Sequence, residues 1–208
     1  IINNTREDGH YDEMPVSYDY RLSNLCNFKC RMCGDQLSSS WETENRINSV
    51  DITDAWLQPN TRRKIFTFQK EVLEEELQDA VDKGIIEEIY WVGGEPLMWE
   101  RHWTIMNQLV STGQAKDVII RYNTNLSRTT FPNKFGQAYQ LYDMLGEFKR
   151  INLCASIDAT GDVGEYIRTG LKWDEWLQNF KDGLFLNELY GDDGMVLDVT
   201  LTTPGLFH

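Results

Sequence analysis

Three of the four cysteines lie within one eight-residue stretch, at Cys26, Cys30 and Cys33, and Cys154 follows more than a hundred positions later. Secreted domains that rely on disulfides spread their cysteines along the chain, so this distribution argues against such a framework. Thiolates at positions i, i+4 and i+7 of one loop can instead converge on one metal centre. The spacing therefore predicts that the loop 26–33 binds a metal.

Two kinds of metal centre would use this loop differently. Zinc usually takes four ligands from paired C-x-x-C segments, and here only Cys30 and Cys33 form such a pair, so His10 or His102 would have to complete the site. Three thiolates without a fourth ligand suit an iron–sulfur cube with one iron left open for chemistry or a ligand. A loop of free thiols is the structural alternative. Cys154 is expected to be a small buried apolar residue of a strand.

The composition limits the function further. The chain has 208 residues, of which 41% are hydrophobic and 25% charged, a balance that excludes disordered, collagen-like and membrane-embedded classes. No apolar run approaches the roughly 20 residues of a membrane span, so no membrane partner is expected. With 33 acidic against 20 basic residues, no nucleic-acid partner is expected either. The single basic cluster, Arg62-Arg63-Lys64, is interpreted as a solvated turn.

Apolar periodicity predicts strands that alternate with helices. The predicted strands are 17–25, 85–92, 117–122, 150–157 and 195–201, and the predicted helices are 69–83, 99–110, 135–145 and 173–184. The stretch 34–67 is polar and is expected to be irregular, an inserted loop that shapes access for a substrate. Five strands separated by four helices indicate parallel pairing with right-handed crossovers, and hence a curved or closed α/β barrel.

Chemically distinctive segments follow or finish four of these strands, at 26–33, 93–95, 123–125 and 156–158. The carboxyl ends of parallel strands form the binding face of α/β folds. We therefore expect these four segments to meet at one edge of the sheet.

Two of these segments carry a family resemblance. The C-x-x-x-C-x-x-C spacing of Cys26–Cys33 and the Gly93-Gly94-Glu95-Pro96 segment resemble the signature and GGEP motifs of radical S-adenosylmethionine (SAM) enzymes. The motifs are about sixty residues apart and each follows a predicted strand. The resemblance covers residues 17–203, and the stretch 25–41 most resembles members with a C-terminal SPASM or twitch domain.

This resemblance implies a partial parallel (β/α) barrel over residues 17–208, preceded by an N-terminal extension over 1–16. A sixth strand is not evident before His208, and residues 1–208 are expected to include no auxiliary domain. The barrel is therefore expected to be truncated at its C-terminus.

The resemblance also implies a set of ligands. Cys26, Cys30 and Cys33 would hold a [4Fe-4S] cluster, whose open iron takes the amino and carboxylate groups of SAM. The implied contacts to SAM are Gly93, Gly94, Glu95, Asn123, Asn125, Ser156, Asp158 and Arg168.

The resemblance implies particular roles for some of these residues, and their chemistry is consistent with those roles. Gly93 and Gly94 lack a Cβ and allow close backbone approach, Glu95 would receive the SAM ammonium, and the Arg168 guanidinium would pair with the SAM carboxylate. Structural alternatives remain for these positions: a carboxylate at a helix start for Glu95, turns or caps for the Asn and Asp residues, and an ion pair for Arg168.

The activity implied is reductive cleavage of SAM to a 5′-deoxyadenosyl radical that abstracts a hydrogen atom, from a peptide or protein in most similar members. A small nucleoside-related substrate is the alternative, and a non-catalytic iron–sulfur or zinc scaffold is a third hypothesis. A flavodoxin or ferredoxin is the implied reductant, expected to dock near Lys29 and Arg31. Because thiolate-bound iron is sensitive to oxygen, a reducing cytoplasm is expected.

Overall fold

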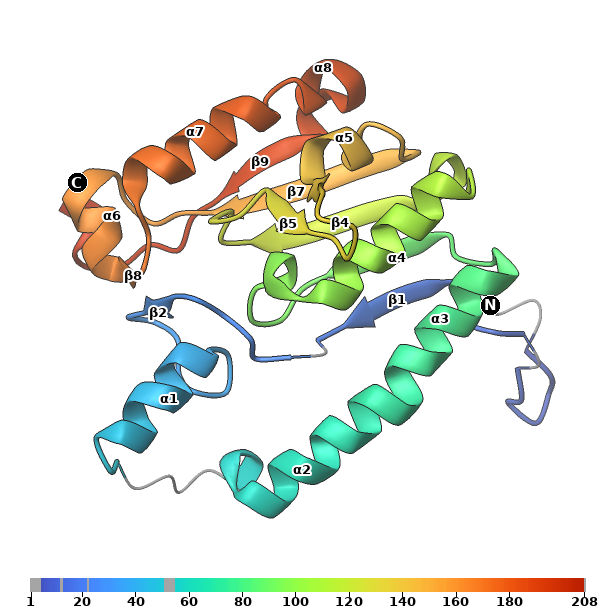
Figure 1. Ribbon diagram of the computed structural model, residues 1–208, viewed down its shortest axis with the longest axis horizontal. Coiled ribbons are helices and arrows are strands. Elements are labelled where there is room, and N and C mark those ends of the chain that lie inside the picture. The colour runs from blue at the N-terminus through green and yellow to red at the C-terminus, as the bar shows by residue number, and fades with distance from the viewer. Residues whose placement is uncertain (1–4, 12, 22, 51–54, 208) are drawn as a thin grey trace.

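The computed structural model describes residues 5–11, 13–21, 23–50 and 55–207. A five-stranded parallel sheet lies at its centre, in the order β1–β3–β4–β7–β9 (Figure 1). The strands are β1 (Ser17–Tyr20), β3 (Glu88–Trp91), β4 (Ile119–Thr124), β7 (Arg150–Ser156) and β9 (Met195–Asp198). The predicted parallel α/β fold is confirmed, and the described strands form an open sheet and not a closed barrel.

One face of this sheet is buried because apolar residues occupy alternate strand positions. Ile89, Ile120 and Ile151 lie in register on adjacent strands, and all three are buried. The helices whose apolar residues join them in one core are α3 (Glu74–Lys83), α4 (Glu100–Ser111), α5 (Leu141–Leu145), α7 (Trp173–Gly183) and α8 (Leu186–Tyr190). The alternate residues face the other side, where the sheet is polar and partly exposed.

The prediction that 34–67 is irregular is wrong, because this stretch contains α1 (Ser39–Ile47) and α2 (Pro59–Phe68). Ser38 caps α1, and Pro59 occupies the first turn of α2, as helix starts favour. Through a π-helical turn over Gln69–Leu73, α2 runs directly into α3. No residue of α2 is buried, and its large apolar side chains are confined to residues 65–68, too short a stretch to show a helical period. The basic cluster 62–64 therefore lies on a helix and not on a turn.

The helix predicted over 135–145 is wrong in its first half. Residues Thr130–Pro132 (β5) and Ala138–Gln140 (β6) form an antiparallel hairpin, and only α5 is helical. The connecting turn explains the error, because Gly136 has a φ of 78° and the Asn133 side chain accepts hydrogen bonds from two turn N–H groups.

Several short elements complete the described chain. The strands predicted over 17–25 and 195–201 are shorter than expected, and α6 (Gly161–Ile167) was not predicted. Two two-residue strands, β2 (Lys29–Cys30) and β8 (Arg168–Thr169), pair antiparallel. Short 3₁₀ turns occupy Ala55–Leu57, Pro96–Met98, Ala115–Asp117, Gly191–Asp193 and Gly205–Phe207. None of the helices in the described part of the chain is long and apolar enough to cross a membrane.

Two leucines on the same face of adjacent strands test the assignment of buried and exposed positions along that face. Leu153 on β7 is 0% exposed, and Leu197 on β9 is 54% exposed. We expect Leu153→Ala to lower the free energy of unfolding by about 2–5 kcal/mol, since it removes packed methyl groups and leaves a cavity. Leu197→Ala should change it by less than about 1 kcal/mol. Urea unfolding measures both, and equal losses would contradict the assignment.

Candidate metal and cofactor site

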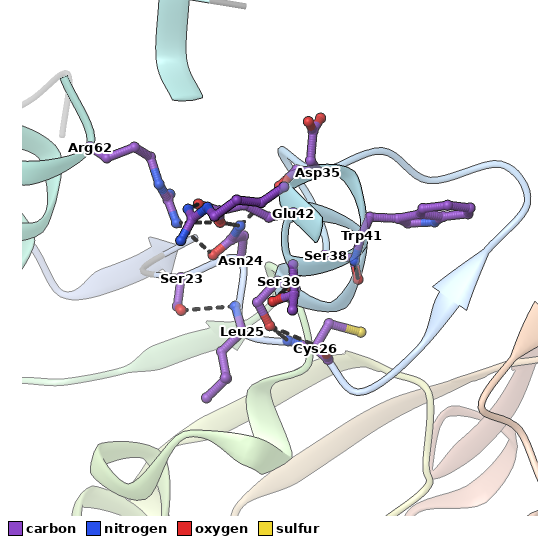
Figure 2. Close-up of polar contacts among 12 residues, drawn as sticks. Ser23, Asn24, Leu25, Cys26, Asp35, Ser38, Ser39, Trp41, Glu42 and Arg62 are labelled. Carbon is purple, nitrogen blue, oxygen red and sulfur yellow. Dashed lines mark hydrogen bonds and ion pairs between the residues drawn. The ribbon is translucent and has the colours of Figure 1, made fainter. Parts of the chain in front are cut away.

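The first turn of α1 holds the cysteine loop in place (Figure 2). Ser39 and Ser40 donate hydroxyl hydrogen bonds to the Cys26 carbonyl at 3.2 and 2.8 Å, and the Cys26 N–H donates to Ser39 Oγ at 3.1 Å. Ser38 donates to the Phe28 carbonyl at 2.5 Å. Few backbone groups of this loop are hydrogen-bonded to a neighbouring strand. The serine hydroxyls therefore supply the hydrogen bonds that its buried backbone groups would otherwise lack.

A second set of contacts ties the loop to both helices of the 34–67 stretch. The Trp41 indole donates to the Cys30 carbonyl at 2.9 Å. Asn24 donates to Glu42 at 2.9 Å, and Arg62 on α2 donates to both Asn24 Oδ1 and Glu42 Oε2, at 3.1 and 2.9 Å. The stretch expected to be an inserted loop is therefore the support of the cysteine loop.

The double glycine after β3 brings two backbone segments into direct contact. The Gly94 N–H donates to the Ser23 carbonyl at 2.9 Å, and the Glu95 N–H donates to the Leu25 carbonyl at 2.7 Å. A Cβ on Gly94 would lie 2.4 Å from the Leu25 carbonyl oxygen, and Gly93 has a φ of 127°, which favours glycine. The glycines thus fix the chain that leads into the cysteine loop.

Glu95 links the end of β3 to the end of β4. Its side chain is buried, and the residue is only 2% exposed. Oε1 accepts from the Leu97 N–H at 3.0 Å and from the Thr124 hydroxyl at 2.7 Å, and Oε2 accepts from the Asn125 N–H at 2.6 Å. Burial raises the pKa of Glu95 to about 7 despite these bonds. The sequence did not predict this link, because no motif or spacing singled out Thr124.

The three thiols lie in two environments. Cys26 is buried, accepts from the Phe28 N–H at 3.4 Å, and lies 3.8 Å from the Asn125 amide nitrogen. Burial raises the pKa of Cys26 to about 11. The Cys30 and Cys33 thiols are hydrogen-bonded to each other, which lowers the pKa of Cys33 and raises the pKa of Cys30. Cys33 is therefore the thiol that most readily supplies a thiolate.

A buried ion pair lies beside these thiols. Arg168 on β8 is paired in register with Cys30, and its guanidinium donates to Asp158 through Nε at 2.7 Å and Nη2 at 2.8 Å. Asp158 also accepts from the Thr200 N–H at 3.1 Å. The sequence predicted that Arg168 and Asp158 each face SAM, whereas the structure bonds them to each other, so Asp158 balances the charge that Arg168 brings next to the cysteine loop.

Asn123 and Ser156, which were also predicted to contact SAM, lie together on the open face of the sheet. The Tyr90 hydroxyl donates to Asn123 Oδ1 at 2.6 Å, and the Asn123 amide donates to Asp198 at 2.7 Å. Ser156 also donates to Asp198, at 3.5 Å. Sequence reasoning missed Tyr90 and Asp198, although the strand period places both on the same face as Asn123 and Ser156.

None of the other thiols or imidazoles considered as ligands joins this loop. Cys154 is half-buried on the open face and donates to Asn152 at 3.4 Å, so the prediction that it is a buried apolar residue is wrong. His102 is buried in the core with Nε2 2.6 Å from the Tyr122 hydroxyl. The N-terminal segment, which contains His10, lies at the opposite end of the sheet from β2 (Figure 1).

The donor set fits a cluster better than a single ion. In the described ranges, no group of three His, Cys, Asp or Glu side chains lies close enough to hold one metal ion. A cube takes one thiolate at each of three corners and does not need them at one point. Three thiols on one supported loop, with hydrogen bonds to Cys26 and a guanidinium nearby, suit that arrangement.

Fold and site together define an open parallel α/β protein with a three-cysteine loop at the carboxyl edge of its sheet. A family model described as the radical SAM superfamily matches residues 20–182, a range that contains all three loop cysteines and the double glycine. The chain belongs to the radical SAM superfamily. Searches of curated proteins and of solved structures gave no match.

The buried carboxyl group of Glu95 makes stability depend on pH. Its folded-state pKa of about 7 lies above the ordinary 4.5, so folding favours the protonated form and the wild type loses stability as pH rises from about 4.5 to about 7. We expect Glu95→Gln to remove a decline of the order of 2–3 kcal/mol. Urea unfolding at pH 5, 6, 7 and 8 measures the difference between the two proteins, in which the titration of Cys33 cancels. Glu147→Gln, at an exposed site, is the control. Parallel pH profiles for wild type and Glu95→Gln would contradict the expectation.

Proposed function

We propose that this chain is a radical SAM enzyme that holds a [4Fe-4S] cluster through Cys26, Cys30 and Cys33. The observation that carries the proposal is the supported three-thiol loop at the carboxyl edge of the sheet, in a chain of this superfamily. When bound, a cluster with one open iron supplies an electron to SAM, which breaks into methionine and a 5′-deoxyadenosyl radical.

The residues at the strand ends are proposed to bind and orient SAM. The Gly93-Gly94 turn lies directly against the backbone that leads into the loop, and Glu95 adds a carboxylate whose burial makes it sensitive to a nearby ammonium. The Asn125 side-chain amide contacts the Cys26 thiol and donates a hydrogen bond to Asn27 Oδ1 at 3.0 Å.

The two remaining pairs are proposed for the other parts of SAM. The Arg168–Asp158 pair lies next to the thiols and suits the methionine carboxylate. Asn123 and Ser156, bonded to Asp198, present the hydroxyl-binding chemistry that a ribose needs.

The substrate is proposed to be a peptide or protein, because residues 25–41 resemble peptide-modifying members of the family. The open face of the sheet supports a polar substrate, since Arg121, Asn123, Asn152 and Ser156 lie on it at alternate positions. A small nucleoside-related molecule remains the alternative.

Product analysis tests the proposal. After anaerobic cluster reconstitution and reduction with dithionite, the wild type should convert SAM to 5′-deoxyadenosine, measured by liquid chromatography. Cys26→Ala, Cys30→Ala and Cys33→Ala should each lose more than about 90% of bound iron and product, since each removes one of three ligands. Cys154→Ala is the matched control and should retain both. Iron and product retained in all three loop variants would contradict the proposal.

The reductant is proposed to be a flavodoxin or ferredoxin that docks beside the loop. Arg31 is exposed there, with its guanidinium 4.2 Å from the Tyr166 ring centroid, whereas Lys29 is paired with Glu44. The charge that steers an acidic donor therefore comes mainly from Arg31.

Charge reversal tests this docking face. Arg31→Glu should slow cluster reduction by an acidic flavodoxin about tenfold at low salt, and adding Lys29→Glu should extend the effect. Reduction by dithionite should stay unchanged, because that small reductant needs no docking. Lys134→Glu, on the β5–β6 turn, is the control, and stopped-flow absorbance gives the rates. Unchanged flavodoxin kinetics in the double variant would reject this face.

A further inference from the structure

A groove of about 770 Å³ separates α2 from the chain that leads into the cysteine loop. It is lined by α2 on one side and residues 23–25 on the other, by Leu37 and Trp56, and by the Gly93 turn with Trp99 at its end. This volume lies in the range of sites that enclose a ligand or several side chains of a partner. The groove is distinct from the network of Asn123, Ser156 and Asp198 on the open face.

Large apolar side chains line this groove without being buried. Trp56 and Phe66 are each 64% exposed, and Leu37 is 53% exposed. Ile65 and Trp99 add half-buried apolar surface. A helix with no buried residue that presents such side chains to a groove is typical of a protein-binding surface.

The charge of the groove is opposite to that of the whole chain. Its lining contains three arginines, Arg21, Arg62 and Arg63, and one carboxylate, Glu74, whereas the chain has 33 acidic and 20 basic residues. Among the described residues, Arg62 is paired with Glu42, whereas Arg63 is exposed and forms no ion pair and Arg21 makes a long 3.9 Å contact with Asp19. A local patch of positive charge on an otherwise acidic protein attracts an acidic partner.

We propose that this groove binds an acidic polypeptide segment that carries aromatic or aliphatic side chains. Its carboxylates pair with Arg63 and Arg21, and its apolar side chains pack against Phe66, Trp56 and Leu37. The proposal deepens the proposed function, because it gives a composition and a binding site to a polypeptide substrate.

The groove also contacts the support of the cysteine loop. Arg62 lines it and donates to Asn24 and Glu42, which hold the loop and α1 (Figure 2). A segment bound there lies against the same backbone that leads to Cys26, and Gly93 joins the groove to the strand end proposed to bind SAM.

Fluorescence anisotropy with a labelled twelve-residue peptide of alternating Glu/Asp and Leu/Phe tests the proposal on the full chain. Saturable binding is expected, and peptides with Lys in place of the acids, or Ala in place of the apolar residues, should bind at least tenfold more weakly. Arg63→Glu and Phe66→Ser should each weaken binding about tenfold or more. Lys116→Glu and Phe135→Ser, at exposed sites far from α2, are the matched controls and should stay within about twofold. Circular dichroism confirms that the variants fold.

Several outcomes would overturn the proposal: no saturable binding, equal losses in groove and control variants, equal binding of the Lys peptide, or preference for a single-stranded oligonucleotide. Because the assay needs no cluster and no SAM, its failure leaves the production of 5′-deoxyadenosine untouched. Loss of that product with peptide binding intact would instead reject the proposed chemistry.

Discussion

The rest of the site depends on one requirement: the backbone of the cysteine loop must be hydrogen-bonded although it lies outside the central sheet. Three consecutive serines at the start of α1 and the indole of Trp41 supply partners to the carbonyls of Cys26, Phe28 and Cys30. Unpaired buried carbonyls would cost about 1–3 kcal/mol each. The thiols can therefore keep a fixed arrangement before any metal binds.

Direct hydrogen bonds also join the cysteine loop to the sheet. The double glycine lets the end of β3 bond directly to Ser23 and Leu25, and Glu95 bonds the end of β3 to the end of β4. The chain that follows β1, the ends of β3 and β4, and the start of α1 thus form a single hydrogen-bonded unit. A ligand that contacts any of them acts on a site whose parts are already fixed relative to one another.

Sequence pattern predicted the parts of this protein that carry a strong local signal. The buried strands at β3, β4 and β7 and the three-thiol loop follow from period and spacing. The support of the loop did not, because Ser38–Ser40 and α2 show no helical period of apolar residues and their role is set by partners far along the chain. The Arg168–Asp158 pair was missed for the same reason: it depends on β8 pairing with β2.

The cysteines also show the limit of strand alternation. Cys154 was assigned to the buried face, yet Leu153 and Ala155 occupy that face and Cys154 faces the open one. Periodicity gives two faces, but only tertiary packing decides which of them is covered.

Electron paramagnetic resonance of the anaerobically purified, dithionite-reduced protein, with and without SAM, tests the central claim most directly. The account predicts the signal of a reduced [4Fe-4S] cube whose g-values shift when SAM is added, because an open iron binds it. A cluster signal indifferent to SAM, or zinc in place of iron, would contradict it.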